Sequence, residues 1–166
     1  IANNGETELS FRSELAKEAF QNTTHYDNAI ASYFAGDKTM PLRYGENPHQ
    51  KAEFQGNLDN IFEKLNGKEL SYNNLLDVDA AVNLISDVSV AGKSSFAVLK
   101  HNNACGLASR STLSQAWDDA LAGDPISAFG GVIAVNKTVD KETAEKMNSL
   151  FFEVLMAPKF NEDALQ

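Results

Sequence analysis

The sequence contains little cysteine and few basic residues, and each shortage excludes a class of protein. The single cysteine, Cys105, excludes an internal disulfide framework and a zinc site built on a Cys-x-x-Cys pair. Fourteen basic residues against 23 acidic ones give a formal charge of −9. This argues against non-specific nucleic-acid binding but leaves room for a local basic pocket that holds one phosphorylated molecule. Because the sequence has neither an apolar run of about 18 residues nor a signal peptide, we expect no membrane association and a cytoplasmic location.

The composition is that of about one globular domain. With 166 residues, 43% hydrophobic and 22% charged, the chain is long enough to bury an ordinary core. Both ends look cut, because the chain opens on Ile1 and residues 161–166 read as a helix that has barely begun. We therefore expect a piece of a longer protein.

Residues 1–39 are predicted to form a short helical segment that precedes an α/β domain over residues 40–166. Within the first segment, Ser10 and Thr24 are expected to cap two successive helices whose apolar side chains face inward. The polar stretch 36–41 then interrupts the pattern and marks the expected boundary.

The second segment alternates strands and helices after an irregular polar stretch, residues 42–57. The spacing of apolar residues predicts helices over 75–88 (with Asn74 as cap), 111–121 and 140–151, and strands over 95–99, 131–135 and 154–156. This alternation is typical of a mainly parallel sheet covered by helices.

A lysine and a histidine follow the first of these strands directly. The strand ending at Leu99 runs into Lys100 and His101 and then into a small-residue turn closed by Gly106. A cation beside a group that can move a proton near neutral pH suits catalysis. The alternative is a surface-facing pair at a strand end.

A second polar cluster lies in the loop that begins with Arg43 and Tyr44. Arginine can bind a phosphate in a forked geometry, and the tyrosine ring can stack on or hydrogen-bond to a ligand ring. The alternative is an ordinary solvated turn built by Gly45 and Pro48.

Three further residues carry weaker signals. Gly130, followed by another glycine, lets the backbone approach a ligand closely, although the loop matches neither a G-x-G-x-x-G nor a Walker pattern. Glu153, just before an apolar strand, can accept a hydrogen bond from a substrate amine or can be a solvated charge at a strand edge. Cys105 fits a small residue packed in a tight turn better than a thiol nucleophile.

Five motifs in a fixed order give the chain a family resemblance. They are RYGENPHQ, GKELSYNNLLDVDAA, KHNNACG, DPISAFGG and VLMAPKF. The chain resembles the bifunctional purine biosynthesis enzymes, which combine 5-aminoimidazole-4-carboxamide ribonucleotide (AICAR) formyltransferase with IMP cyclohydrolase. The stretch 9–34 is similar to the end of the cyclohydrolase domain and its connector, and 40–166 to the first part of the formyltransferase domain.

The resemblance implies a cytidine-deaminase-like three-layer fold in a homodimeric enzyme of IMP synthesis. It also implies 10-formyltetrahydrofolate as co-substrate and no zinc, in keeping with a sequence that lacks the HxE and PCxxC motifs of zinc deaminases. The second transferase copy, which supplies most folate contacts, is expected beyond Gln166, so we expect the 166 residues alone to be inactive. The alternatives are a zinc-free nucleotide-binding domain without turnover and a dimer-interface module.

The resemblance also implies roles for individual residues. His101 matches the family's proton acceptor and Lys100 the residue that stabilises the transition state. The positions that contact the AICAR nucleotide are matched by Arg43, Tyr44, Gly130 and Glu153. One departure is visible, because Ala104 replaces the usual proline of the Asn-Pro-Cys-Gly turn, which is expected to loosen that turn.

Overall fold

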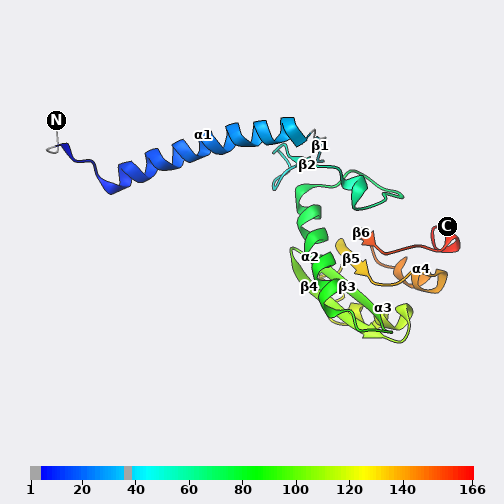
Figure 1. Ribbon diagram of the computed structural model, residues 1–166. Helices are drawn as coiled ribbons and strands as arrows, with labels where there is room; N and C mark the ends of the chain where they lie inside the picture. Colours follow the sequence, from blue (N-terminus) through cyan, green and yellow to red (C-terminus); the bar gives the residue numbers. More distant parts are fainter. Residues whose placement is uncertain (1–4, 36–38) are drawn as a thin grey trace. The chain divides into compact units, whose positions relative to one another are not determined.

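The computed structural model describes residues 5–35 and 39–166 and divides the chain into two compact units (Figure 1). Unit 1 comprises Ile1–Pro41 and Glu53–Gly67, and unit 2 comprises Leu42–Ala52 and Lys68–Gln166. The domain boundary expected near residue 40 stays a prediction.

Unit 1 contains one long helix where two were expected. Helix α1 runs without interruption over Leu9–Ala35, so the prediction of a second helix capped by Thr24 is wrong. The neighbouring Thr23 hydroxyl donates to the carbonyl of Phe20 inside the helix instead of capping a new one. The apolar side chains expected to face inward are exposed in this unit, among them Phe11, Leu15, Phe20, Ile30, Tyr33 and Phe34.

The rest of unit 1 is a short antiparallel pair followed by one helical turn. Strand β1 (Thr39–Pro41) pairs with β2 (Glu53–Gln55), and η2 (Leu58–Asn60) follows. The sequence pattern missed both strands because each has only three residues. Of the break expected over 36–41, residues 36–38 lie outside the described part of the chain.

Unit 2 is built on a four-stranded mixed sheet in the order β4-β3-β5-β6. Its strands are β3 (Ser94–Lys100), β4 (Asn103–Arg110), β5 (Gly131–Val135) and β6 (Phe152–Met156). β3 is antiparallel to both β4 and β5, and β5 is parallel to β6.

The prediction of a mainly parallel sheet is therefore wrong, and one missed strand explains the error. The sequence pattern predicts a turn after His101, whereas the segment forms β4, which makes a hairpin with β3. β4, β5 and β6 run in the same direction and are joined through helices, as the alternation predicts. β3 lies between β4 and β5 in the opposite direction.

Helices cover both faces of the sheet, which makes three layers. α2 (Tyr72–Val88) contacts β3, β5 and β6, while α3 (Leu113–Leu121) contacts β3, β4 and α4 (Lys141–Met147). The core on the α3 and α4 side includes Phe96 and Trp117, whose ring centroids are 5.1 Å apart. Successive strand residues point to opposite faces, so the alternate buried residues of β3 face α2.

Each α-helix of unit 2 begins at a side-chain cap, whereas the short 3-10 helix η3 (Glu162–Ala164) does not. Ser71 caps α2 and accepts from the Asn74 backbone N–H in a capping box, so the prediction of Asn74 as the cap is displaced by three residues. Thr112 caps α3 by accepting from the Gln115 backbone N–H, and Asp140 caps α4 by accepting from the Thr143 backbone N–H. α4 ends at Met147, four residues before the end expected from the sequence.

α3 packs so closely on β4 that Gly106 leaves no room for a side chain, which predicts that a larger residue there destabilises the fold. A Cβ on this glycine would lie 1.8 Å from the backbone oxygen of Ala120, so backbone must move to admit it. Gly106→Ala should lower the free energy of unfolding by about 1–3 kcal/mol or more, measured by urea denaturation. The matched control Gln115→Ala, at an exposed position of α3, should change it by less than about 0.5 kcal/mol. Equal stability of the two variants would contradict the prediction.

Candidate active site

The six residues singled out in the sequence lie in unit 2, and those on strands gather at one end of its sheet. Lys100 ends β3, Gly130 precedes β5, and Glu153 lies near the start of β6. Because β3 is antiparallel to β5, the carboxyl end of β3 meets the amino ends of β5 and β6. The beginning of α2 lies at the same end, through the bond of Asn74 to Glu153.

The Arg43 loop is attached to the entry of α2 by main-chain hydrogen bonds. The Arg43 N–H donates to the carbonyl of Leu70 at 2.9 Å, and the Tyr72 N–H donates to the carbonyl of Tyr44 at 3.0 Å. These bonds bracket Ser71, the buried N-cap of α2. The loop backbone is therefore fixed by the rigid helix and is not an isolated solvated turn.

The Arg43 guanidinium makes three side-chain contacts. Its Nη2 lies 3.4 Å from Asn74 Oδ1 and 3.7 Å from Glu153 Oε2. The guanidinium carbon lies 5.0 Å from the centroid of the Tyr44 ring, a cation–π distance, and Nη2 lies 3.3 Å from the Tyr44 hydroxyl. The Arg43 side chain remains 35% exposed, so part of it is accessible to a ligand.

Asn74 joins Arg43 and Glu153, and sequence reasoning missed this function. Its Nδ2 donates to Glu153 Oε2 at 2.7 Å, and its Oδ1 accepts from the Ser71 backbone N–H and hydroxyl. A buried amide with these contacts fixes the orientation of both charged side chains. The Ser-x-x-Asn spacing at the helix start contained the capping signal but not the link to residue 153.

A second group of contacts surrounds Lys100. Its Nζ donates to the carbonyl of Phe129, and a Cβ on Gly130 would lie 2.9 Å from that Nζ. Gly130 has φ +67° and donates its N–H to the carbonyl of Phe151 at 2.7 Å. Only glycine adopts this conformation without strain, and its missing side chain leaves the space in which the ammonium lies.

His101 lies in the tight turn between β3 and β4. His101 and Asn102 have φ values of 52° and 60°, the left-handed pair of a type I′ hairpin turn. The conformation is uncommon for residues other than glycine, although asparagine and histidine adopt it more often than most. The exposed imidazole is thereby displayed at the tip of the hairpin, beyond the Lys100–Asn103 pair.

Cys105 is the extra residue of a bulge in β4, because Leu99 pairs with Ala104 and Val98 with Gly106. Ala104 thus lies in the strand and not in the turn that its replacement of proline was expected to loosen. Burial, and next the nearby Asp124 carboxylate, raise the pKa of the Cys105 thiol; Lys100 lowers it by less than Asp124 raises it, and Asp77 adds a still smaller increase.

A raised pKa predicts an unreactive thiol. Less thiolate is present at neutral pH, so iodoacetamide should alkylate Cys105 more slowly in the native chain than in the same chain unfolded in urea. The two rates, followed by mass spectrometry at one pH, give the comparison. A native rate equal to the unfolded one would contradict the prediction and reopen a nucleophilic role.

Asp124 begins the loop that leads to β5 and stabilises that loop with its side chain. Asp124 accepts from the Ser127 backbone N–H at 3.0 Å and from its hydroxyl at 2.7 Å, and these bonds lower the pKa of Asp124. The loop leads to Phe129, whose ring centroid lies 5.4 Å from that of Phe151. The two rings flank the Gly130 turn.

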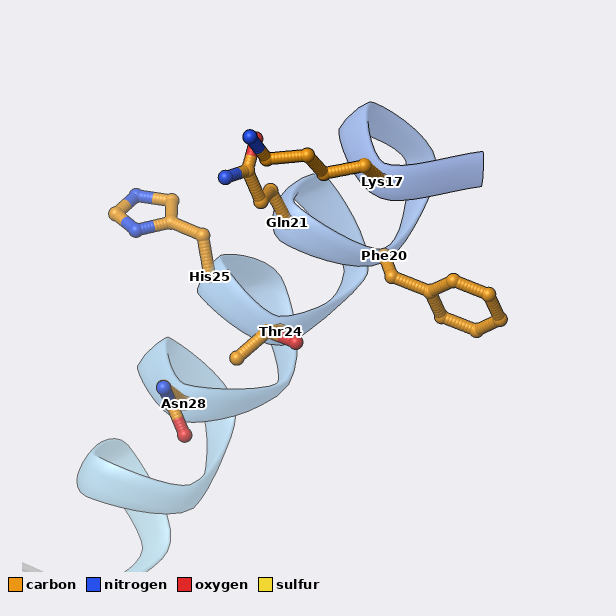
Figure 2. A pocket seen from close by; sticks show the side chains of 6 residues that line it. All are labelled: Lys17, Phe20, Gln21, Thr24, His25 and Asn28. Carbon is orange, nitrogen blue, oxygen red and sulfur yellow. The ribbon is translucent and has the colours of Figure 1, made fainter. Parts of the chain in front are cut away.

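Two hollows are found in the part of the chain that the structure describes, and the second borders Phe151. A shallow one of about 480 Å³ runs along α1 and is lined by exposed side chains of that helix alone (Figure 2). Lys17, Gln21 and His25 point to one side of the helix and Phe20 to another. The other, of about 530 Å³, is an apolar groove in unit 2 between α4, β6 and the chain end.

Two absences apply to the described residues, 5–35 and 39–166. No group of three or more His, Cys, Asp or Glu side chains there is arranged to hold a metal ion. No helix in that part of the chain is long and apolar enough to cross a membrane.

Comparison with known proteins bears on the whole length of the chain. The model of the AICARFT/IMPCHase bienzyme family matches residues 1–166. The chain belongs to this family. The family resemblance found in the sequence is thereby confirmed.

Curated relatives in the family carry the name bifunctional purine biosynthesis protein PurH. The one from Bacteroides thetaiotaomicron is 55% identical over 168 residues, which cover 95% of this chain and 32% of the relative. The one from Chloroflexus aurantiacus is 44% identical over 172 residues, which cover 97% of this chain and 34% of the relative. The chain thus spans about a third of the length of these relatives.

Proposed function

We propose that the chain supplies the AICAR-binding residues and the Lys100–His101 pair of an AICAR formyltransferase. The observation that carries the proposal is the hydrogen bond of Asn74 to Glu153, which brings the Arg43 cluster to the sheet end where Lys100 and Gly130 lie. The proposed phosphate-binding, carboxylate and proton-accepting groups (Arg43, Glu153 and His101) come from three separate segments and are thus attached to one scaffold. Membership of the bienzyme family supports the same reaction.

The reaction explains why these side chains are needed. The 5-amino group of AICAR is a poor nucleophile because its lone pair is delocalised toward the carboxamide. A new C–N bond forms between this nitrogen and the formyl carbon of 10-formyltetrahydrofolate, and the bond from that carbon to folate N10 breaks. The amino nitrogen loses a proton and the departing N10 gains one.

His101 and Lys100 are assigned to the two charge changes of this transfer. A neutral His101 imidazole accepts the proton of the attacking amine, an effect worth about 10²–10⁴-fold in rate. The Lys100 ammonium stabilises charge on the formyl oxygen or on the departing folate nitrogen. To do so it exchanges its bond to the Phe129 carbonyl for one to the substrate.

The Arg43 cluster is assigned to AICAR itself. Arg43 binds the phosphate with guanidinium N–H groups that are not directed at Asn74 or Glu153, and Tyr44 packs beside the ligand. Glu153 accepts a hydrogen bond from a substrate amine, and Gly130 lets the nucleotide approach the backbone. Both substrates are held in register at one sheet end, which lowers the entropic part of the barrier.

Further features of the family belong to the same proposal. We propose a cytidine-deaminase-like fold for unit 2, supported by its three layers. We also propose that the complete enzyme is a cytoplasmic homodimer that works without a metal, takes 10-formyltetrahydrofolate as co-substrate, and closes the ring to IMP in a cyclohydrolase domain. The 166 residues alone are expected to be inactive in formyl transfer.

The test is an assay of a full-length family member that carries this segment. Given AICAR and 10-formyltetrahydrofolate, it should release formyl-AICAR, and AICAR should raise its melting temperature. A shift without turnover would favour a nucleotide-binding domain over an enzyme. Neither shift nor turnover would favour an interface module and would refute the proposal.

A further inference from the structure

We infer that Asp77 is a positioning residue for formyl transfer, because its carboxylate holds the turn that displays His101. The Asn102 backbone N–H donates to Asp77 Oδ1 at 2.6 Å, a contact between residues 25 apart in the sequence. Asp77 lies on α2 and is half-buried, whereas His101 and Asn102 are exposed. The inference rests on the proposed function of His101.

The conformation of this turn needs support. His101 and Asn102 both have positive φ, and a residue other than glycine adopts this backbone conformation at a cost in energy. The Asn103 side chain donates to the His101 carbonyl at 2.8 Å, which stabilises the turn from within the hairpin. Asp77 adds a charge-assisted bond from a separate helix, and that bond fixes the turn relative to the rest of the unit.

The same face of α2 also fixes the substrate side of the site. Asn74 lies three residues before Asp77, so the two side chains are neighbours on the helix surface. Asn74 binds Glu153 and lies within 3.4 Å of Arg43, while Asp77 binds the turn after Lys100. The first turns of α2 thus set the distance between the proposed nucleotide groups and the proposed proton acceptor.

This arrangement predicts a split between two kinetic constants. Loss of the Asp77 contact frees the His101 turn but leaves the Arg43 cluster intact, so kcat for formyl transfer should fall and KM for AICAR should not. A displacement of about 1 Å at a reacting group can cost on the order of 10²-fold in rate. We therefore expect kcat to fall by roughly 10- to 100-fold.

The experiment compares Asp77→Ala, Asp77→Asn and Asp77→Glu in a full-length family member that carries this segment. Asp77→Asn keeps an acceptor oxygen at the same reach, and Asp77→Glu keeps the charge but displaces the oxygen by one methylene. We expect Asp77→Ala and Asp77→Glu to lose kcat with KM for AICAR within about twofold of wild type, and Asp77→Asn to retain most of the wild-type kcat. The control Asp79→Ala, exposed on the same helix, should match wild type.

Amide hydrogen exchange at Asn102 separates this inference from the proposed function. Exchange should become faster in Asp77→Ala and stay near wild type in Asp77→Asn. Unchanged exchange, an unchanged kcat in Asp77→Ala, or an Asp77→Asn variant as slow as Asp77→Ala would each overturn the positioning role. Absence of formyl transfer in the wild-type protein would overturn the proposed function and this inference with it. If Asp77→Ala fails to fold, the Asp77→Asn and Asp77→Glu pair decides the question.

Discussion

His101→Ala in a full-length family member that carries this segment should lower kcat for formyl transfer by about 10²–10⁴-fold. The imidazole is the group assigned to accept the proton of the attacking amine, and alanine offers no base in its place. Cyclohydrolase activity should stay near that of the wild type, because that reaction is assigned to another domain. Both rates are measured by absorbance with purified protein.

Because His101 has a positive φ, the alanine variant needs a second variant as its control. Alanine at φ 52° is strained, so a loss of activity can come from the turn as well as from the imidazole. His101→Asn places a residue that tolerates the left-handed region but accepts no proton near neutral pH. We expect both variants to lose formyl transfer. Transfer within about twofold of wild type in either variant would refute the assignment of His101.

Arg43→Lys should weaken AICAR binding and leave folate binding largely unchanged. A lysine cannot reproduce the forked contact of a guanidinium with a phosphate, nor its simultaneous contacts with Asn74 and Tyr44. A hydrogen bond to a charged group is worth about 1.5–3 kcal/mol. The dissociation constant of AICAR, measured by calorimetry, should therefore rise by about one to two orders of magnitude.

The unphosphorylated riboside distinguishes a ligand contact from a structural one. It lacks the group that Arg43 is assigned to hold, so wild type and Arg43→Lys should bind it almost equally. Arg43 also lies 3.7 Å from Glu153 inside the protein, and a purely structural role would act through that contact. Equal losses of riboside and nucleotide affinity would show that Arg43 supports the loop and does not bind the phosphate.

The central elements of unit 2 could be predicted from the sequence because their local signals agree with their packing. β5 begins and ends where its apolar run does, at Gly131 and Val135, since all five residues are buried. α3 carries an apolar face bounded by its Thr112 cap, and it was predicted within two residues. A run of only five apolar residues indicates a strand by its length, and apolar residues that recur with the helical period on one face indicate a helix.

β4 could not be predicted because its sequence gives no strand signal. The stretch from Asn103 to Arg110 contains small residues, a glycine and a bulge, and the turn before it is His101-Asn102 where Asn-Gly is usual. Its strand conformation depends on pairing with β3 and on α3 packed against Gly106. Missing this strand reversed the expected direction of β3 relative to β5.

The candidate site divides in a similar way. Motifs and family resemblance pointed to Lys100, His101 and Arg43, which are adjacent to recognisable sequence signals. Asn74 and Asp77 were missed as site residues, because the importance of each depends on a partner at least 25 residues away in the chain. Such partners emerge only when the fold brings distant segments together.

The two main-chain bonds that attach the Arg43 loop to α2 also have a consequence for chain length. Between Arg43 and Leu70 the chain leaves unit 2 after Ala52 and returns at Lys68, and these bonds hold the two ends of the excursion together. The entropy of closing such a loop grows only with the logarithm of its length, about 0.6 kcal/mol for each doubling. Insertions and deletions between Ala52 and Lys68 should therefore change the free energy of unfolding little and be tolerated in evolution. Changes at the residues that form the closing bonds should be tolerated less.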